Sequence, residues 1–100
     1  MRKGLFRVMI GRMTKEEIRL IGHAVGEGRS PERRRCGYAK LARRHFCATP
    51  GEADAIAWDA IVAQGWAVRH PPRDGWMPLA TYIVTPEGFE AWKAAASGGA

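Results

Sequence analysis

The spacing of apolar residues along the chain changes from a helical period to an alternating one. Ile21 and Val25 lie one helical turn apart. Thr14 and Glu17 ahead of them have the spacing of a capping box, in which side chains and backbone amides at the start of a helix cap each other. The apolar pattern stops at Gly26, and glycine often follows a last helical turn. These features predict a helix over residues 15–25.

Three further Ser or Thr residues stand where a helix is expected to begin. Each is followed by proline, whose fixed φ suits the first helical position. Ser30-Pro31 precedes RRRCGYAKLARRHF, where Gly37 is expected to separate a first turn from a helix over residues 38–46. Thr49-Pro50-Gly51-Glu52 again has capping-box spacing and predicts a helix to Gln64 that stops at Gly65. Thr85-Pro86-Glu87 predicts a last helix to about residue 96.

Two segments between the last two helices have the composition of strands. Residues 66–68 alternate, and residues 79–84 are rich in β-branched and aromatic side chains. Prolines 71, 72 and 78 cannot donate to a central ladder, so the connection is expected to be a loop with Asp74-Gly75 as its turn. The order of elements predicts one small α+β domain over residues 14–96. An N-terminal extension over 1–13 and a flexible tail over 97–100 would flank it.

The composition agrees with one small core. The chain has 100 residues, of which 46% are apolar. No run of about 18 apolar residues is present, and Arg7 and Arg12 interrupt the apolar start, so neither a membrane span nor a secretory signal is expected. A cytoplasmic location is the resulting expectation. Aromatic residues at apolar positions are expected in the core, although one or two tryptophans could instead anchor a partner protein: Phe6, Trp58, Trp66, Tyr82, Phe89 and Trp92.

The charge is distributed unevenly. Residues 1–50 carry 13 Lys or Arg against 4 Asp or Glu, whereas residues 51–100 carry 3 against 6, and the chain as a whole has a net charge of +6. A single positive face that binds a polyanionic or acidic partner would explain this uneven charge distribution. The alternative explanation is that the positive charge serves only to keep the protein in solution. Trp76 could stack on a base or pack under its loop. The candidate binding residues are Arg29, Arg33, Arg34, Arg35, Lys40, Arg43, Arg44, Arg69, His70, Arg73 and Trp76.

Metal and catalytic chemistry are weakly indicated. Cys36 and Cys47, with His45 near the second, could form half a metal site, but structural zinc sites show close Cys or His pairs, and two half-buried thiols are the simpler interpretation. A nucleophile needs an adjacent base and an orienting group, and no Ser or Cys here has such a motif around it. No glycine-rich phosphate loop follows a strand. We therefore expect no cofactor, no metal and no enzymatic activity.

The segment DAIVAQGWAVR, followed by YIVTPEGFEAW, resembles a winged helix-turn-helix domain. The likeness covers about residues 38–96 if LARRHF is the preceding helix. It implies a helix that enters the DNA major groove, followed by a β-hairpin wing and a Thr-x-x-Gly turn into the last helix. The matching residues are Gly65, Trp66, Val68, Arg69, Tyr82, Val84, Thr85, Gly88 and Trp92.

The chain is also similar to small proteins of bacteriophages and prophages. These proteins begin near a Met-Thr pair, here Met13-Thr14, pass through an Arg-rich segment, here residues 33–47, and end in the same hairpin. This likeness implies that residues 1–12 precede the usual start. It supplies no biochemical role.

The helix before the expected wing, EADAIAWDAIVAQ, has three acidic residues and no basic one. Its large apolar residues spread over most of its circumference and are expected to leave a stripe of Glu52, Ala55, Asp59 and Ala63 exposed. Phosphates would repel such a stripe. Contact with nucleic acid is therefore expected from residues 29–44 and from the hairpin residues 69–73, which would hold phosphates without reading sequence.

Two functions from different classes follow from these features. The first is a non-enzymatic regulatory module that binds nucleic acid or a nucleoprotein complex through a basic face. The alternative is a phage-encoded, anti-CRISPR-like inhibitor of a host defence complex, whose basic face occupies a nucleic-acid site or an acidic protein surface. A structural piece of a virion is a third possibility.

Overall fold

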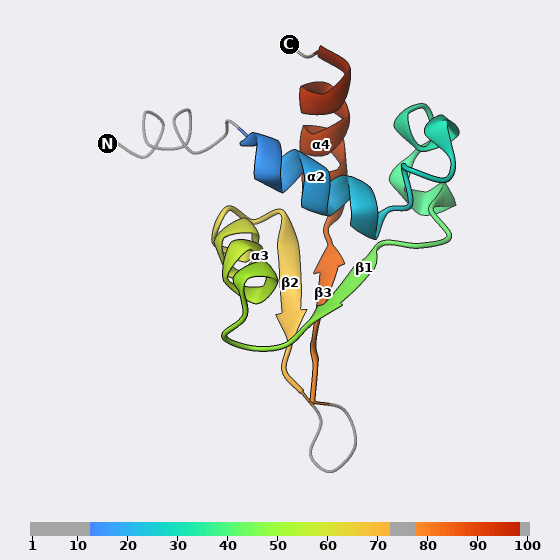
Figure 1. The fold of residues 1–100 in the computed structure, drawn as a ribbon. Helices are drawn as coiled ribbons and strands as arrows, with labels where there is room; N and C mark the ends of the chain where they lie inside the picture. The colour runs from blue at the N-terminus through green and yellow to red at the C-terminus, as the bar shows by residue number, and fades with distance from the viewer. Residues whose placement is uncertain (1–12, 73–77, 99–100) are drawn as a thin grey trace.

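The computed structural model describes residues 13–72 and 78–98, so Arg73, Trp76, Phe6 and the Asp74-Gly75 turn lie outside the described residues. The predicted α+β class is confirmed. In chain order the elements are α2 (Lys15–Ala24), the short 3-10 helices η1 (Pro31–Arg34) and η2 (Tyr38–Lys40), β1 (His45–Ala48), α3 (Ala53–Ala63), β2 (Ala67–His70), β3 (Ala80–Val84) and α4 (Pro86–Gly98) (Figure 1).

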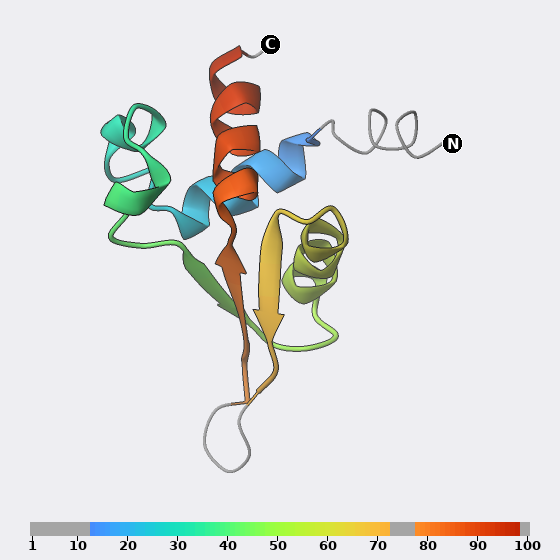
Figure 2. The same ribbon diagram turned by 180° about the vertical axis from the view of Figure 1, so that it is seen from behind.

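The three strands form one antiparallel sheet in the order β1-β3-β2, so β1 and β2 are its edges. Phe46 and Arg69 flank Tyr82 in one cross-strand row. Trp58 of α3 stacks on Tyr82 with ring centroids 5.6 Å apart, which identifies this face of the sheet as the one that α3 covers. Both views show α2 and α4 crossing at one end of the sheet and α3 lying beside β2 (Figure 2).

The predicted capping box of α2 is confirmed. The Glu17 amide donates to Thr14 Oγ1 at 3.1 Å, and the Thr14 amide donates to Glu17 Oε1 at 2.8 Å. Ile21 and Val25 are fully buried, and the chain leaves the helix at Gly26 with a φ of 77°. The predicted helix over residues 15–25 therefore forms, with its end at Ala24.

The predicted helix over residues 38–46 is wrong. A single 3-10 turn, η2, ends at Leu41, whose φ of −71° and ψ of 125° are extended, and β1 then begins at His45. Leu41 is buried and Ala42 is exposed. Local helix propensity gives way here because the backbone from Arg44 onward pairs with β3, beginning with the Val84 amide that donates to the Arg44 carbonyl at 2.9 Å.

The absence of that helix also affects the winged-helix likeness. In the described part of the chain α3 follows a strand directly, so the pair of consecutive helices that gives a helix-turn-helix its name is not present between residues 38 and 64.

The predicted hairpin strands are confirmed within two residues at their ends, as β2 and β3.

Helix α3 forms as predicted, but its start differs. The Glu52 amide donates to the Thr49 carbonyl at 3.0 Å, and Gly51 has a φ of 89°, so Thr49 to Glu52 make a turn rather than the predicted capping box. Glu52 is the N-cap and makes no side-chain capping bond. The predicted exposed stripe is also wrong in part, because Ala55 is buried and Ile56 is 61% exposed.

The stop at Gly65 and the cap at Thr85 are confirmed. Gly65 has a φ of 87°, and the Gly88 amide donates to Thr85 Oγ1 at 3.0 Å. A Cβ on Gly88 would overlap the carbonyl of Trp66. The backbone just before β2 and the first turn of α4 are therefore in direct contact. Helix α4 continues to Gly98, two residues beyond its predicted end.

The predicted aromatic core is confirmed for every member within the described residues. Trp58, Tyr82, Phe89 and Trp92 are at most 1% exposed, and Trp66 is 7% exposed. These rings join the sheet to α3 and α4.

Candidate functional site

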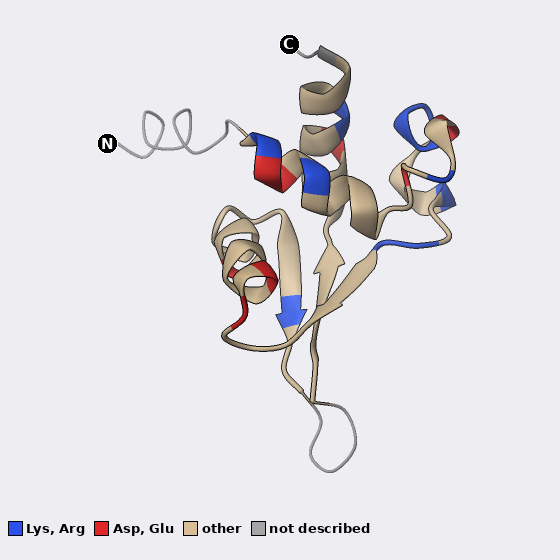
Figure 3. Cartoon of the chain, viewed as in Figure 1, with Lys and Arg blue, Asp and Glu red and all other residues tan. Residues whose placement is uncertain are grey.

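Seven of the predicted binding residues lie on one irregular excursion between α2 and β1. We call this segment, residues 29–44, the basic lobe; it contains η1 and η2 and projects beside the end of the sheet. Figure 3 shows Lys and Arg concentrated on this lobe, whereas Asp and Glu are spread over α2, α3, α4 and the lobe. The structure thus brings together Arg29, Arg33, Arg34, Arg35, Lys40, Arg43 and Arg44.

Little of the lobe's positive charge is neutralised by described acidic residues. Arg34 forms an ion pair with Glu27 at 3.3 Å. Glu32, the acidic residue of the lobe, accepts a hydrogen bond from the Ser30 hydroxyl at 2.7 Å, and this bond lowers the pKa of Glu32 below its usual value. Within the described residues no ion pair engages Arg29, Arg35, Lys40 or Arg43, and the lobe therefore keeps a net positive charge.

Side-chain contacts fix the lobe to the rest of the domain. The Tyr38 hydroxyl donates to the Val84 carbonyl at 2.7 Å, and Lys93 Nζ of α4 donates to the Cys36 carbonyl at 3.2 Å. The Arg44 guanidinium lies over the Tyr38 ring, 4.6 Å from its centroid. Arg33 is half-buried, and its Nε has no hydrogen-bond partner among the described residues. The lobe is irregular but is positioned against β3 and α4.

Arg69 does not join the basic lobe. It lies on β2, at the opposite edge of the sheet from β1, and its Nε is 3.7 Å from Asp59 Oδ1 and 3.3 Å from the Tyr82 hydroxyl. The Tyr82 hydroxyl donates to Asp59 at 2.8 Å. Burial, followed by this hydrogen bond to Asp59, raises the pKa of Tyr82 above its usual value. Arg69 therefore connects β2 to α3, and His70 at the end of β2 remains exposed.

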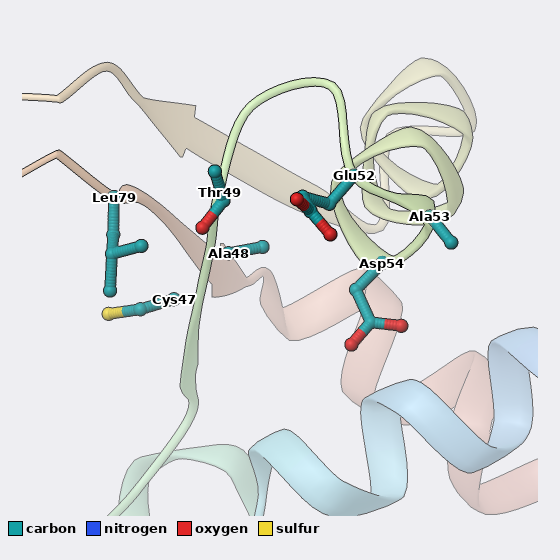
Figure 4. Close-up of a pocket in the computed structure, with 7 residues that line it drawn as sticks. All are labelled: Cys47, Ala48, Thr49, Glu52, Ala53, Asp54 and Leu79. Carbon is teal, nitrogen blue, oxygen red and sulfur yellow. The ribbon is translucent and has the colours of Figure 1, made fainter.

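The exposed side of α3 is acidic. Glu52, Asp54 and Asp59 are all exposed, and Ile56 lies among them. A pocket of about 350 Å³ opens between the end of β1 and the start of α3. Figure 4 shows the carboxylates of Glu52 and Asp54 on its α3 side, across from Cys47 and Leu79. The charge of this pocket makes it unsuitable for phosphate.

A second, smaller pocket of about 260 Å³ lies where the basic lobe meets β1. Its lining residues from this region are Arg43 and three residues of β1, namely His45, Phe46 and Cys47. His23, in the last turn of α2, also lines it. The His23 ring meets the Phe46 ring edge-on, with centroids 5.5 Å apart. The sequence indicated nothing of His23, because its role depends on the packing of α2 against β1.

The two cysteines are half-buried and unpaired with each other, as predicted. Over residues 13–72 and 78–98, no three His, Cys, Asp or Glu side chains group closely enough to hold a metal ion. None of the described helices is long and apolar enough to cross a membrane. Comparison of the chain with protein-family models, with curated proteins and with solved structures finds no match.

Proposed function

We propose that this chain is a non-enzymatic module that binds the phosphate backbone of nucleic acid through the basic lobe. The single observation that carries this proposal is the concentration of seven Lys and Arg side chains on one lobe, largely without acidic partners in the described chain. Arg and Lys that approach phosphates displace counterions, so affinity falls steeply as salt rises. By binding to nucleic acid or to a nucleoprotein complex, the module would act as a regulator.

Contact with the backbone rather than with base edges follows from the charge of α3. In a winged-helix reader, the helix before the wing supplies basic or amide side chains to the major groove. Here that helix presents Glu52, Asp54 and Asp59 to solvent. The hairpin could add a second contact through His70, Arg73 and Trp76, in the manner of a wing. The binding mode we propose is therefore electrostatic and largely independent of sequence.

The test is a duplex titration at 50 and 200 mM salt with two charge-matched variants. The double variant Arg35→Ala/Lys40→Ala removes two exposed charges of the basic lobe, and Lys15→Ala/Arg19→Ala removes two exposed charges of α2. We expect the lobe variant to weaken binding about tenfold or more and to reduce the salt slope by about two, because each phosphate contact contributes a slope of about one. The α2 variant should change the affinity and the salt slope much less. Equal effects of the two variants, or no binding of duplex at 50 mM salt, would overturn the proposal.

A protein partner is the second candidate, and one observation favours it. Ile56 is 61% exposed on α3 between Glu52 and Asp59, an arrangement that a phosphate backbone would not use but a protein interface could. In this case the chain would inhibit a host complex, with the basic lobe on an acidic or nucleic-acid-binding surface. Loss of partner binding in Ile56→Asp, with duplex binding unchanged, would support this candidate.

A further inference from the structure

The smaller pocket lies along the free edge of β1. Among the described residues, strand β1 pairs with β3 alone, and the register places Phe46 opposite Tyr82 and His45 opposite Ile83. The Val84 amide donates to the Arg44 carbonyl, so residues 44, 46 and 48 direct their backbone hydrogen-bonding groups toward β3. The amides and carbonyls of the alternate residues, His45 and Cys47, therefore point away from β3, along the edge where the pocket opens.

Three of the side chains that line the pocket carry nitrogen donors: Arg43, His23 and His45. Arg43 precedes His45 by two residues and is half-buried, and the His45 side chain lines the same pocket. His23 also lines it, and its ring packs edge-on against Phe46, the β1 neighbour of His45. Phe46 forms the apolar side. None of the described residues that line this pocket is a carboxylate, in contrast to the acidic pocket at the start of α3.

We propose that this pocket is a phosphate-binding site, in which Arg43 and the outward amides of β1 hold one phosphate of the bound nucleic acid. The inference rests on the proposed function and adds to it a fixed anchoring point. Backbone amides and a guanidinium are the donors that phosphate oxygens accept best, and a half-buried guanidinium loses less rotamer freedom on binding than an exposed one. Arg44, the neighbouring cation, is held over Tyr38 instead.

The first experiment titrates inorganic phosphate into the 15N-labelled full chain and follows amide chemical shifts. We expect saturable shifts at the His45 and Cys47 amides that chloride at the same ionic strength does not produce. Arg43→Ala should abolish them, Arg43→Lys should retain a weaker effect, and Arg35→Ala, which removes the same charge outside the pocket, should leave them unchanged. Dispersed spectra of the variants would establish that each is folded. Equal shifts from phosphate and chloride would overturn the inference.

The second experiment links the pocket to nucleic acid. Arg43→Ala should weaken duplex binding about tenfold and lower the salt slope by about one, with Arg35→Ala having a smaller effect on affinity. Salt-sensitive duplex binding that Arg43→Ala and Arg35→Ala weaken equally would overturn the pocket as an anchor and leave the proposed function intact. Phosphate binding in the pocket without any duplex binding would instead overturn the proposed function. It would assign the pocket to a free phosphate or a small phosphorylated molecule.

Discussion

The basic lobe buries one residue, Leu41, whereas the scaffold of α2, the sheet, α3 and α4 buries every large aromatic side chain of the core. The lobe carries seven cations and no α-helix or strand. The exposed side of α3 carries carboxylates. The fold thus places positive charge where few core contacts depend on it, and we expect substitutions in the two regions to have different consequences: loss of stability in the scaffold and loss of binding in the lobe.

Two glycine substitutions should give the largest contrast. Gly88→Ala places a methyl group against the Trp66 carbonyl, and backbone atoms cannot yield as a flexible side chain can, so we expect about 3 kcal/mol of destabilisation. Gly37, in the lobe, has a φ of −87°, and a Cβ added to it by Gly37→Ala would meet no neighbouring atom within 4 Å. This substitution should leave stability unchanged or raise it by about 0.5 kcal/mol. Urea denaturation of both variants measures the difference in free energy of unfolding. Similar losses of stability in the two variants would contradict the contrast between scaffold and lobe.

A smaller effect is expected at the joint between the two regions. Tyr38→Phe removes the hydrogen bond to the Val84 carbonyl and leaves that acceptor with one fewer donor, at a cost of about 1 kcal/mol. The ring under Arg44 is retained. We expect faster hydrogen exchange in residues 38–44 with little change in α3. Uniformly faster exchange across the domain would show that the lobe is not a separately anchored unit.

The smallest effect concerns pH. Because the pKa of Tyr82 is raised in the folded state above its usual value of 10.0, the unfolded state loses this proton first, and stability should decline as pH rises above about 10. Below that pH the contribution of Tyr82 is fully present. Tyr82→Phe should show a shallower decline over the same range. Identical alkaline slopes of wild type and variant in urea denaturation would exclude this contribution.

Local signals in the sequence predicted the parts of the fold that depend on neighbours in the chain. The Thr14 capping box, the Gly65 stop and the Thr85 cap are short-range features and were predicted correctly. β1 was missed because LARRHF has helical spacing, and only its pairing with β3, 32 to 38 residues later, makes it a strand. The Thr49 capping box failed because Gly51 adopts a positive φ, which a helix start does not allow.

The candidate site was predictable to the extent that it is contiguous in sequence. The Arg-rich run identified the basic lobe. Arg69 was predicted as a contact of the hairpin, and its pairing with Asp59 could not be predicted, since it depends on α3 packing beside β2. His23 was missed for the same reason, because α2 and β1 meet only in the folded chain.

The most direct test of the account is an amide chemical-shift map of the 15N-labelled chain with a short duplex at low salt. We predict that the perturbed amides concentrate in residues 29–47 and that α3, residues 53–63, shows little change. Perturbations centred on α3, with the basic lobe unaffected, would contradict the account.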